Sequence, residues 1–89
     1  MSRRKEWRKA LDAEVRRWSA MSCDALIAAL RESQNYEITF ESKSYQVEVV
    51  LLENTDTYVH VMLSIDDGSL SAFVVPLSDT FIRQKQAAE

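Results

Sequence analysis

Apolar and polar residues alternate along residues 45–75 in three successive segments. Alternation with a period of two is typical of β-strands that bury one face. Residues 36–41 alternate in the same way, so the pattern predicts four strands, the last of them ending before Pro76. The positions expected on the buried face are Tyr36, Ile38, Phe40, Tyr45, Val47, Val49, Leu51, Val59, Val61, Leu63, Ile65, Leu70, Ala72 and Val74.

Helical spacing replaces this alternation at both ends of the chain. Over residues 4–18, apolar residues recur at spacings of four, four and three, which predicts one buried stripe formed by Trp7, Leu11, Val15 and Trp18. Ser22 is expected to cap a second helix over residues 23–32, and Ser78 a short C-terminal helix. We therefore expect one α+β domain over residues 1–89. Two N-terminal helices would pack on one face of a four-stranded antiparallel β-meander, followed by the C-terminal helix (ααββββα).

Two of the three turns are expected to contain two residues each. Asp67-Gly68 is the strongest hairpin signal in the chain and would pair Ile65 with Leu70. Ser42-Lys43 would pair Phe40 with Tyr45 in the same way.

The length of the middle turn decides whether the aliphatic residues of the second and third predicted strands lie on the same face of the sheet. A two-residue turn would set Glu48 beside Val61 and place the aliphatic residues of the two longest strands on opposite faces. Burying each aliphatic side chain contributes about 1.5–3 kcal/mol, more than the ~1 kcal/mol at stake in a preferred turn type. We therefore predict a three-residue loop over residues 54–56, with Asp56 in a left-handed conformation.

The second face of the predicted sheet is polar at one side only. Its other side carries seven residues that would form an apolar patch on the order of 500 Å² if left exposed. Aromatic residues and methionine with few charges are typical of interface centres. The expected interface residues are Val50, Leu52, Tyr58, His60, Met62, Phe73 and Val75.

Two explanations of this patch remain open. The chain could self-associate as a homodimer or bind a protein partner there, in which case Phe73→Glu should dissociate the dimer without unfolding it. Alternatively, the C-terminal helix could cover the patch with Phe81, Ile82 and Ala88.

Composition narrows the function classes. Cys23 is the only cysteine, which excludes an internal disulfide and favours a reducing, cytoplasmic setting. No secretory signal or membrane-spanning run is expected. With a single histidine, a single cysteine and a single glycine, neither a structural zinc site nor a glycine-rich phosphate loop is expected. We expect no metal and no cofactor, and we favour a non-enzymatic role, as in a small bacterial-type domain whose main role is protein interaction.

His60 and Cys23 are the two residues that could carry chemistry. His60 could act as a general base oriented by Glu48, with Tyr58 nearby, in a small-ligand or weakly enzymatic site. The alternative is a histidine that fills space in a half-apolar strand. Cys23 begins a predicted helix, where a thiolate is favoured, but no base is placed beside it, and a partly buried structural role is expected.

Charge is divided unevenly along the chain. Residues 1–17 carry seven basic and three acidic side chains, a net +4, whereas the remainder carries −7, for −3 overall. A basic helix with two tryptophans is compatible with a nucleic-acid contact. The order of elements loosely resembles that of double-stranded-RNA-binding domains. That family has lysines at the start of its last helix, where this chain has Ser78-Asp79-Thr80. Nucleic-acid binding is therefore the weaker expectation.

Overall fold

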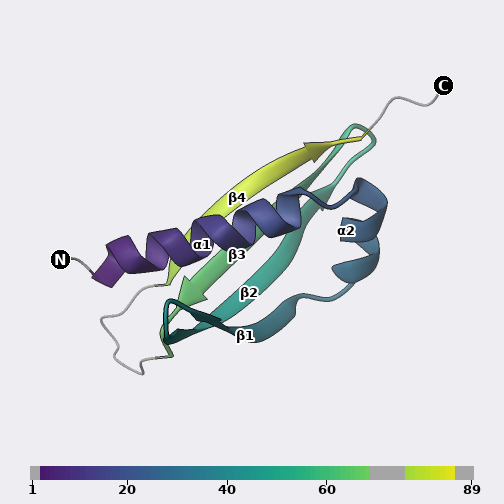
Figure 1. Cartoon of the computed structure of the whole chain (residues 1–89). Helices are drawn as coiled ribbons and strands as arrows, with labels where there is room; N and C mark the ends of the chain where they lie inside the picture. The colour runs from purple at the N-terminus through teal and green to yellow at the C-terminus, as the bar shows by residue number, and fades with distance from the viewer. Residues whose placement is uncertain (1–2, 69–75, 86–89) are drawn as a thin grey trace.

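The chain forms two layers, a sheet and a pair of helices on one of its faces (Figure 1). In this computed structural model, residues 3–68 and 76–85 are described. The helices are α1 (Arg3–Ser19) and α2 (Cys23–Ala29). The strands are β1 (Gln34–Phe40), β2 (Lys43–Asn54), β3 (Tyr58–Asp66) and β4 (Leu77–Gln84), paired antiparallel in the order β1-β2-β3-β4. The predicted α+β class, with two N-terminal helices and a four-stranded antiparallel sheet, is confirmed.

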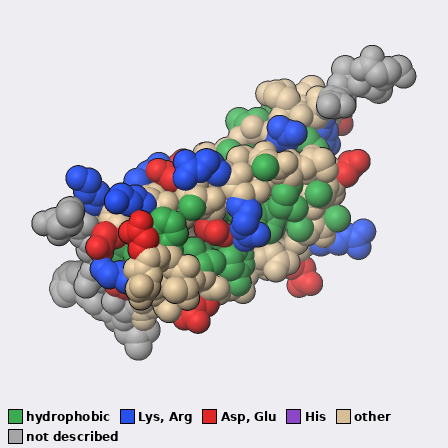
Figure 2. Space-filling model, in the orientation of Figure 1, with side chains coloured by type: hydrophobic (Ala, Val, Ile, Leu, Met, Phe, Trp, Pro, Cys, Tyr) green, Lys and Arg blue, Asp and Glu red, His purple; other side chains and the backbone are tan. Residues whose placement is uncertain are grey.

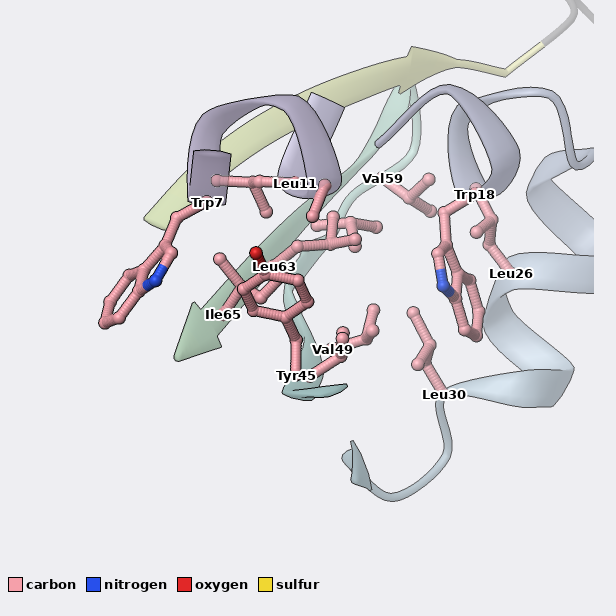
Figure 3. Close-up of a cluster of buried hydrophobic side chains, with 13 residues drawn as sticks. Trp7, Leu11, Trp18, Leu26, Leu30, Tyr45, Val49, Val59, Leu63 and Ile65 are labelled. Carbon is pink, nitrogen blue, oxygen red and sulfur yellow. The ribbon is translucent and has the colours of Figure 1, made fainter. Parts of the chain in front are cut away.

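The inner face of the sheet, which the helices cover, holds the core. The predicted helical stripe is inside, with Trp7, Leu11 and Trp18 buried and Val15 partly buried against them. α1 lies along β3 and β4, and α2 packs at the end near Trp18 (Figure 3). Beneath them, the fully or nearly fully buried strand residues are Tyr45, Val47, Val49, Val59, Val61, Leu63 and Ile65. All seven belong to the face that alternation predicts to be buried.

The helix boundaries follow from local chemistry. The side chain of Ser22 accepts a hydrogen bond from the Ala25 amide at 3.1 Å, which confirms it as the N-cap of α2. In α1, Glu6 lies in the first turn and Arg16 and Arg17 in the last, where each charge is favoured by the helix dipole.

The pairing of β2 with β3 preserves the predicted faces by an unexpected route. Val49 lies opposite Leu63 and Leu51 opposite Val61, while Glu48 lies opposite Ser64 and not Val61. The predicted three-residue loop would have paired Val49 with Val61 and Leu51 with Val59, and the observed partners lie two residues away, which keeps these side chains on the expected face. Glu53 is the exception, because it lies opposite His60 on the other face.

The loop between β2 and β3 was expected to contain an odd number of residues, so that the aliphatic side chains of both strands face the same way. The extra residue lies instead within β2, in a β-bulge between Leu51 and Glu53. At the turn itself, Thr55 N donates to Tyr58 O at 2.9 Å, closing a two-residue turn. Asp56 is not among the described residues with positive φ, so the predicted left-handed conformation is wrong there.

The β1–β2 turn lies one residue earlier than predicted. Phe40 pairs with Lys43 and Ile38 with Tyr45, again a shift of two residues that conserves the faces. The turn residues Glu41 and Ser42 have φ of 50° and 68°, a left-handed pair that matches the twist of a tight hairpin.

This turn leads to a first prediction. Replacing Glu41 with Asn and Ser42 with Gly should raise the unfolding free energy by about 1 kcal/mol, because both new residues tolerate positive φ better. Urea unfolding of the double variant against the parent chain measures the change. A decrease would show that the turn does not have this conformation in solution.

The C-terminal part of the predicted fold requires a correction. Ser78 does not begin a helix: residues 77–84 form β4, which pairs with β3 through Ile65 opposite Leu77 and Val61 opposite Phe81. Leu77 and Phe81 are four residues apart, a spacing that suits one face of a helix and one face of a strand equally well. Residues 77–84 form a strand because they lie along the open edge of β3, where a strand can hydrogen-bond with the backbone N–H and C=O groups of β3.

The predicted two-residue hairpin at Asp67-Gly68 is also wrong, since Ile65 pairs with Leu77 and not with Leu70. Gly68 nevertheless has the expected positive φ of 80°, and its amide donates to Asp66 Oδ1 at 2.7 Å. The predicted strand over residues 70–75 lies outside the described residues.

One polar cluster joins α1 to β1 within this core. Glu14, which is buried, accepts hydrogen bonds from the Tyr36 hydroxyl at 2.6 Å and from Arg17 at 3.0 Å. The same hydroxyl accepts from Trp18 Nε1 at 2.7 Å. Burial, and then the bond to Glu14, raises the pKa of Tyr36. Among the described residues, no fully buried side-chain nitrogen or oxygen lacks a hydrogen-bond partner, and this cluster ties α1 to β1.

Candidate interaction surface

The outer face of the sheet is the side opposite the helices, and its central strand presents three predicted interface residues. Strand alternation in β3 places Tyr58, His60 and Met62 there, each partly buried by its neighbours. Val50 of β2 lies opposite Met62, and Ile82 of β4 lies opposite His60. Three adjacent strands therefore contribute to one continuous patch.

The bulge in β2 brings a carboxylate into this patch. Leu52 is the extra residue, and Glu53 lies opposite His60. Glu53 Oε1 accepts a hydrogen bond from the Tyr58 hydroxyl at 3.2 Å and lies 3.3 Å from His60 Nδ1. The negative charge of Glu53 raises the pKa of Tyr58. The structure thus groups Glu53, Tyr58 and His60 on the surface.

Glu48, the carboxylate expected to orient His60, lies elsewhere. It faces Ser64 of β3 and Asn35 of β1, because the bulge changes the count between Glu48 and the turn. Glu53, and not Glu48, is the carboxylate beside His60. Sequence reasoning missed it because a bulge is not visible in a simple alternation.

Leu52 and Ile82 are the exposed large hydrophobic residues among those described, at 44% and 53% of full exposure. Both described helices lie on the opposite, inner face of the sheet (Figure 1). Cover by a C-terminal helix through Phe81 and Ile82 is contradicted, because Phe81 packs on the inner face and Ile82 points outward from β4. Ala88, the third residue expected to cover the patch, lies outside the described residues.

We call this surface the apolar half of the outer face. Its apolar and aromatic members are Val50, Leu52, Tyr58, His60, Met62 and Ile82, and Glu53 lies among them, opposite His60. Phe73 and Val75, also predicted for the interface, lie outside the described residues. Ile82 was missed as an interface residue because its segment was assigned to a helix; reading residues 77–84 as an alternating strand would have found it.

The polar half occupies the other end of the same face. Its residues line a shallow hollow and include Asn35, Gln46, Glu48, Ser64, Asp66 and Ser78. Glu37 also belongs to it, and accepts a hydrogen bond from Gln46 at 3.2 Å. At the described outer-face positions of the four strands there is no lysine or arginine. Every full charge of the polar half is therefore negative.

Cys23 lies away from both halves. Its thiol is 3.5 Å from the backbone oxygens of Arg83 and Gln84, at the end of β4. His60 faces the outer side of the sheet, so the arrangement does not pair the thiol with that base. Within the described ranges, no group of three or more His, Cys, Asp or Glu side chains is arranged to hold a metal ion.

The basic residues of α1 are partly neutralised inside the molecule. Arg8 pairs with Asp12 at 3.3 Å and with Asp79 of β4 at 2.7 Å, and Arg17 pairs with Glu14. Figure 2 shows acidic side chains among the Lys and Arg side chains on this side of the molecule. Such pairing reduces the positive surface potential that binding to a nucleic-acid phosphate backbone requires. With β4 in place of a final helix, the layout also departs from that of double-stranded-RNA-binding domains.

Of the described helices, none is long and apolar enough to cross a bilayer. The chain matches no protein-family model, and no curated protein or solved structure is significantly similar to it.

Proposed function

We propose that this chain is a non-enzymatic assembly module that forms a homodimer through the apolar half of its outer face. The observation that carries the proposal is the coincidence of Leu52 and Ile82, both well exposed, beside Val50 and Met62 on adjacent strands. A two-fold dimer is the commonest way for such a patch to be covered.

The size of the patch limits how strong a dimer could be. It spans three strands spaced about 4.8 Å apart and about five residues along each, a flat area of about 250 Å² per copy. Twice that area, with its rim, falls below the ~1,000 Å² of a stable interface. We therefore expect reversible association that becomes visible only at high micromolar concentration or above. The unpaired Cys23 is consistent with a reducing compartment such as the cytoplasm.

The test of this proposal is Ile82→Glu. A carboxylate in the middle of the contact should weaken dimerisation at least about tenfold, because burying an unpaired charge is unfavourable. The monomer should remain folded, since Ile82 lies on an edge strand with more than half of its side chain in water. Sedimentation equilibrium up to millimolar concentration measures association, and thermal unfolding measures the fold.

Ala28→Glu is the matched control, because Ala28 is exposed on the helix side of the molecule and the substitution adds the same charge. Equal association of Ile82→Glu and Ala28→Glu, or a parent chain that stays monomeric throughout, would contradict the proposal.

A second candidate function rests on the grouping of Glu53, Tyr58 and His60. Glu53 could hold His60 in one orientation, as a general base or ligand-binding group requires. We give this function second place because the three side chains lie on an open surface. Ligands bound there would raise the melting temperature in a metabolite screen. His60→Ala should abolish the shift; a shift that survives the substitution would place the ligand elsewhere.

A further inference from the structure

We infer that the free edge of β1, the side of the strand away from β2, binds an extended segment of a partner protein, which adds to the sheet as a further strand. In this segment, apolar residues alternate with basic or other polar ones. The site lies on a different surface from the apolar half of the outer face, so the inference does not depend on the proposed dimer.

The free edge of β1 presents backbone hydrogen-bonding groups. β1 is the first strand in the order of the sheet and pairs with β2 alone among the described strands. Phe40 and Lys43 flank a two-residue turn and therefore form a hydrogen-bonded pair, so alternation directs the N–H and C=O groups of Glu37 and Thr39 away from β2. Within the described part of the chain, no other backbone segment hydrogen-bonds to these groups. Such an edge is a template for an added strand.

The other edge of the sheet is protected in a way that β1 is not. β4 follows Pro76 directly, and its pairing with β3 places the charged residues Asp79 and Arg83 on the inner face. Proline and inward-pointing charges are devices that prevent an edge from pairing with another chain. β1 contains no proline and no charged residue on its inner face. Of the two edge strands, β1 is therefore the one suited to an added strand.

Partly exposed hydrophobic side chains line this edge on the inner face. Tyr36, Ile38 and Phe40 pack against the core without being fully buried, because α1 lies along β3 and β4 on the other half of the sheet (Figure 1). Figure 2 shows hydrophobic side chains at the surface in the region between α1 and β1. An added strand would place every second side chain beside these three and complete their burial. We therefore expect apolar residues at these positions of the partner.

The outer face determines the charge at the remaining positions of the partner. Glu37 is exposed there and accepts a hydrogen bond from Gln46, while Glu48 and Asp66 lie on the neighbouring strands. No lysine or arginine occupies a described outer-face position of the four strands. Opposite charges directly across a strand pair are favourable and like charges are unfavourable. The partner is therefore expected to carry lysine or arginine opposite Glu37.

Amide hydrogen exchange measured by NMR tests the backbone contact directly. In the free chain, the Ile38 amide should be protected by its bond to β2, whereas those of Glu37 and Thr39 should exchange rapidly. The probe is a synthetic peptide of about nine residues in which valine and lysine alternate. At saturation it should slow exchange at Glu37 and Thr39 at least about tenfold.

Three results would overturn the inference. The first is no binding of the valine–lysine peptide at about 1 mM. The second is binding that leaves the amides of Glu37 and Thr39 unprotected. The third is protection of these amides by raised protein concentration without peptide, which would show that a second copy occupies the edge.

Proline substitution tests the same contact by affinity. Thr39→Pro removes an N–H that points away from β2, so it should preserve the β1–β2 pairing and weaken the valine–lysine peptide at least about fivefold. Thr39→Ala keeps the N–H and should bind within about twofold of the parent chain. Equal affinities of the two variants, each shown by circular dichroism to be folded, would contradict the use of the backbone edge.

A charge exchange tests the chemistry of the partner. Glu37→Lys should weaken the valine–lysine peptide about fivefold and strengthen a matching valine–glutamate peptide. Asp56→Lys makes the same change of charge at the exposed turn between β2 and β3, away from β1, and should alter both affinities by less than about twofold. Equal effects of the two substitutions would show attraction to the net charge of the chain and would contradict a site at β1.

Discussion

Replacing Leu63 with Ala is expected to lower the unfolding free energy by about 3 kcal/mol. Leu63 is fully buried on β3 beneath α1, and loss of its side chain leaves a cavity that packed neighbours fill only in part. For a domain of this size, the loss is a large fraction of the total stability. Chemical denaturation monitored by circular dichroism measures it.

Met62→Ala is the matched control, one residue earlier on the same strand. Met62 points to the outer face, so truncation should cost the monomer less than about 1 kcal/mol. The same substitution should weaken dimerisation, because Met62 belongs to the apolar half. Equal destabilisation by the two variants would contradict the assignment of the two faces.

Tyr36→Phe is expected to lower the unfolding free energy by about 2 kcal/mol. The substitution removes one oxygen but disturbs several hydrogen bonds, because the hydroxyl bonds Glu14, Trp18 Nε1 and Arg17. Glu14 then loses one partner in a buried position, and buried polar groups without partners are costly. Tyr58→Phe is the control: its hydroxyl bonds only Glu53 at the surface, and a change below about 0.5 kcal/mol is expected. Comparable losses in the two variants would contradict the role of the cluster.

The raised pKa of this Tyr36 hydroxyl also predicts that the unfolding free energy falls at alkaline pH. Because the pKa of Tyr36 is raised in the folded state, mainly by burial, the protonated form is the one that folding favours. Its contribution is fully present below the unfolded tyrosine pKa of about 10, and is lost as pH rises through the higher folded value. Stability measured from pH 8 to 11 should fall less steeply in Tyr36→Phe than in the parent chain. Tyr45 and Tyr58, whose pKa values are also raised, contribute to the remaining slope.

Alternation predicted the two faces of the first three strands, although every predicted pairing was displaced. A shift of two residues in the strand pairing leaves each side chain on the same face of the sheet. The need to bury residues such as Val49 and Val61 therefore determines which face each residue occupies, but not which residues pair across strands. The register depends on turn and bulge geometry. Neither the left-handed pair at Glu41 and Ser42 nor the bulge at Leu52 has a sequence signal as strong as Asp67-Gly68, which does not form the predicted hairpin.

The last strand could not be predicted from its own residues. Local spacing in residues 77–84 permits either helix or strand, and the choice depends on β3, which needs a partner along its second edge. The same limit applies to Glu14. The helical spacing of residues 4–18 gives no sign that Glu14 is buried, and it is buried because Tyr36 and Arg17 supply its hydrogen bonds. Long-range pairing of this kind is set by tertiary structure.

The division of the outer face was predictable in part. Polar residues around Glu48 and apolar residues around Met62 already differ in the sequence, and the structure places them at opposite ends of one surface. The contributions of Glu53 and Ile82 were not predicted, since the first depends on the bulge and the second on the identity of β4.

An NMR dilution series of the unlabelled protein, from millimolar to low micromolar concentration, tests the central claim most directly. Self-association through the apolar half predicts concentration-dependent amide shifts that cluster at Val50, Leu52, His60, Met62 and Ile82, with residues of α1 unaffected. Shifts that map instead to α1 or to the edge of β1, or a spectrum that does not change with concentration, would contradict it.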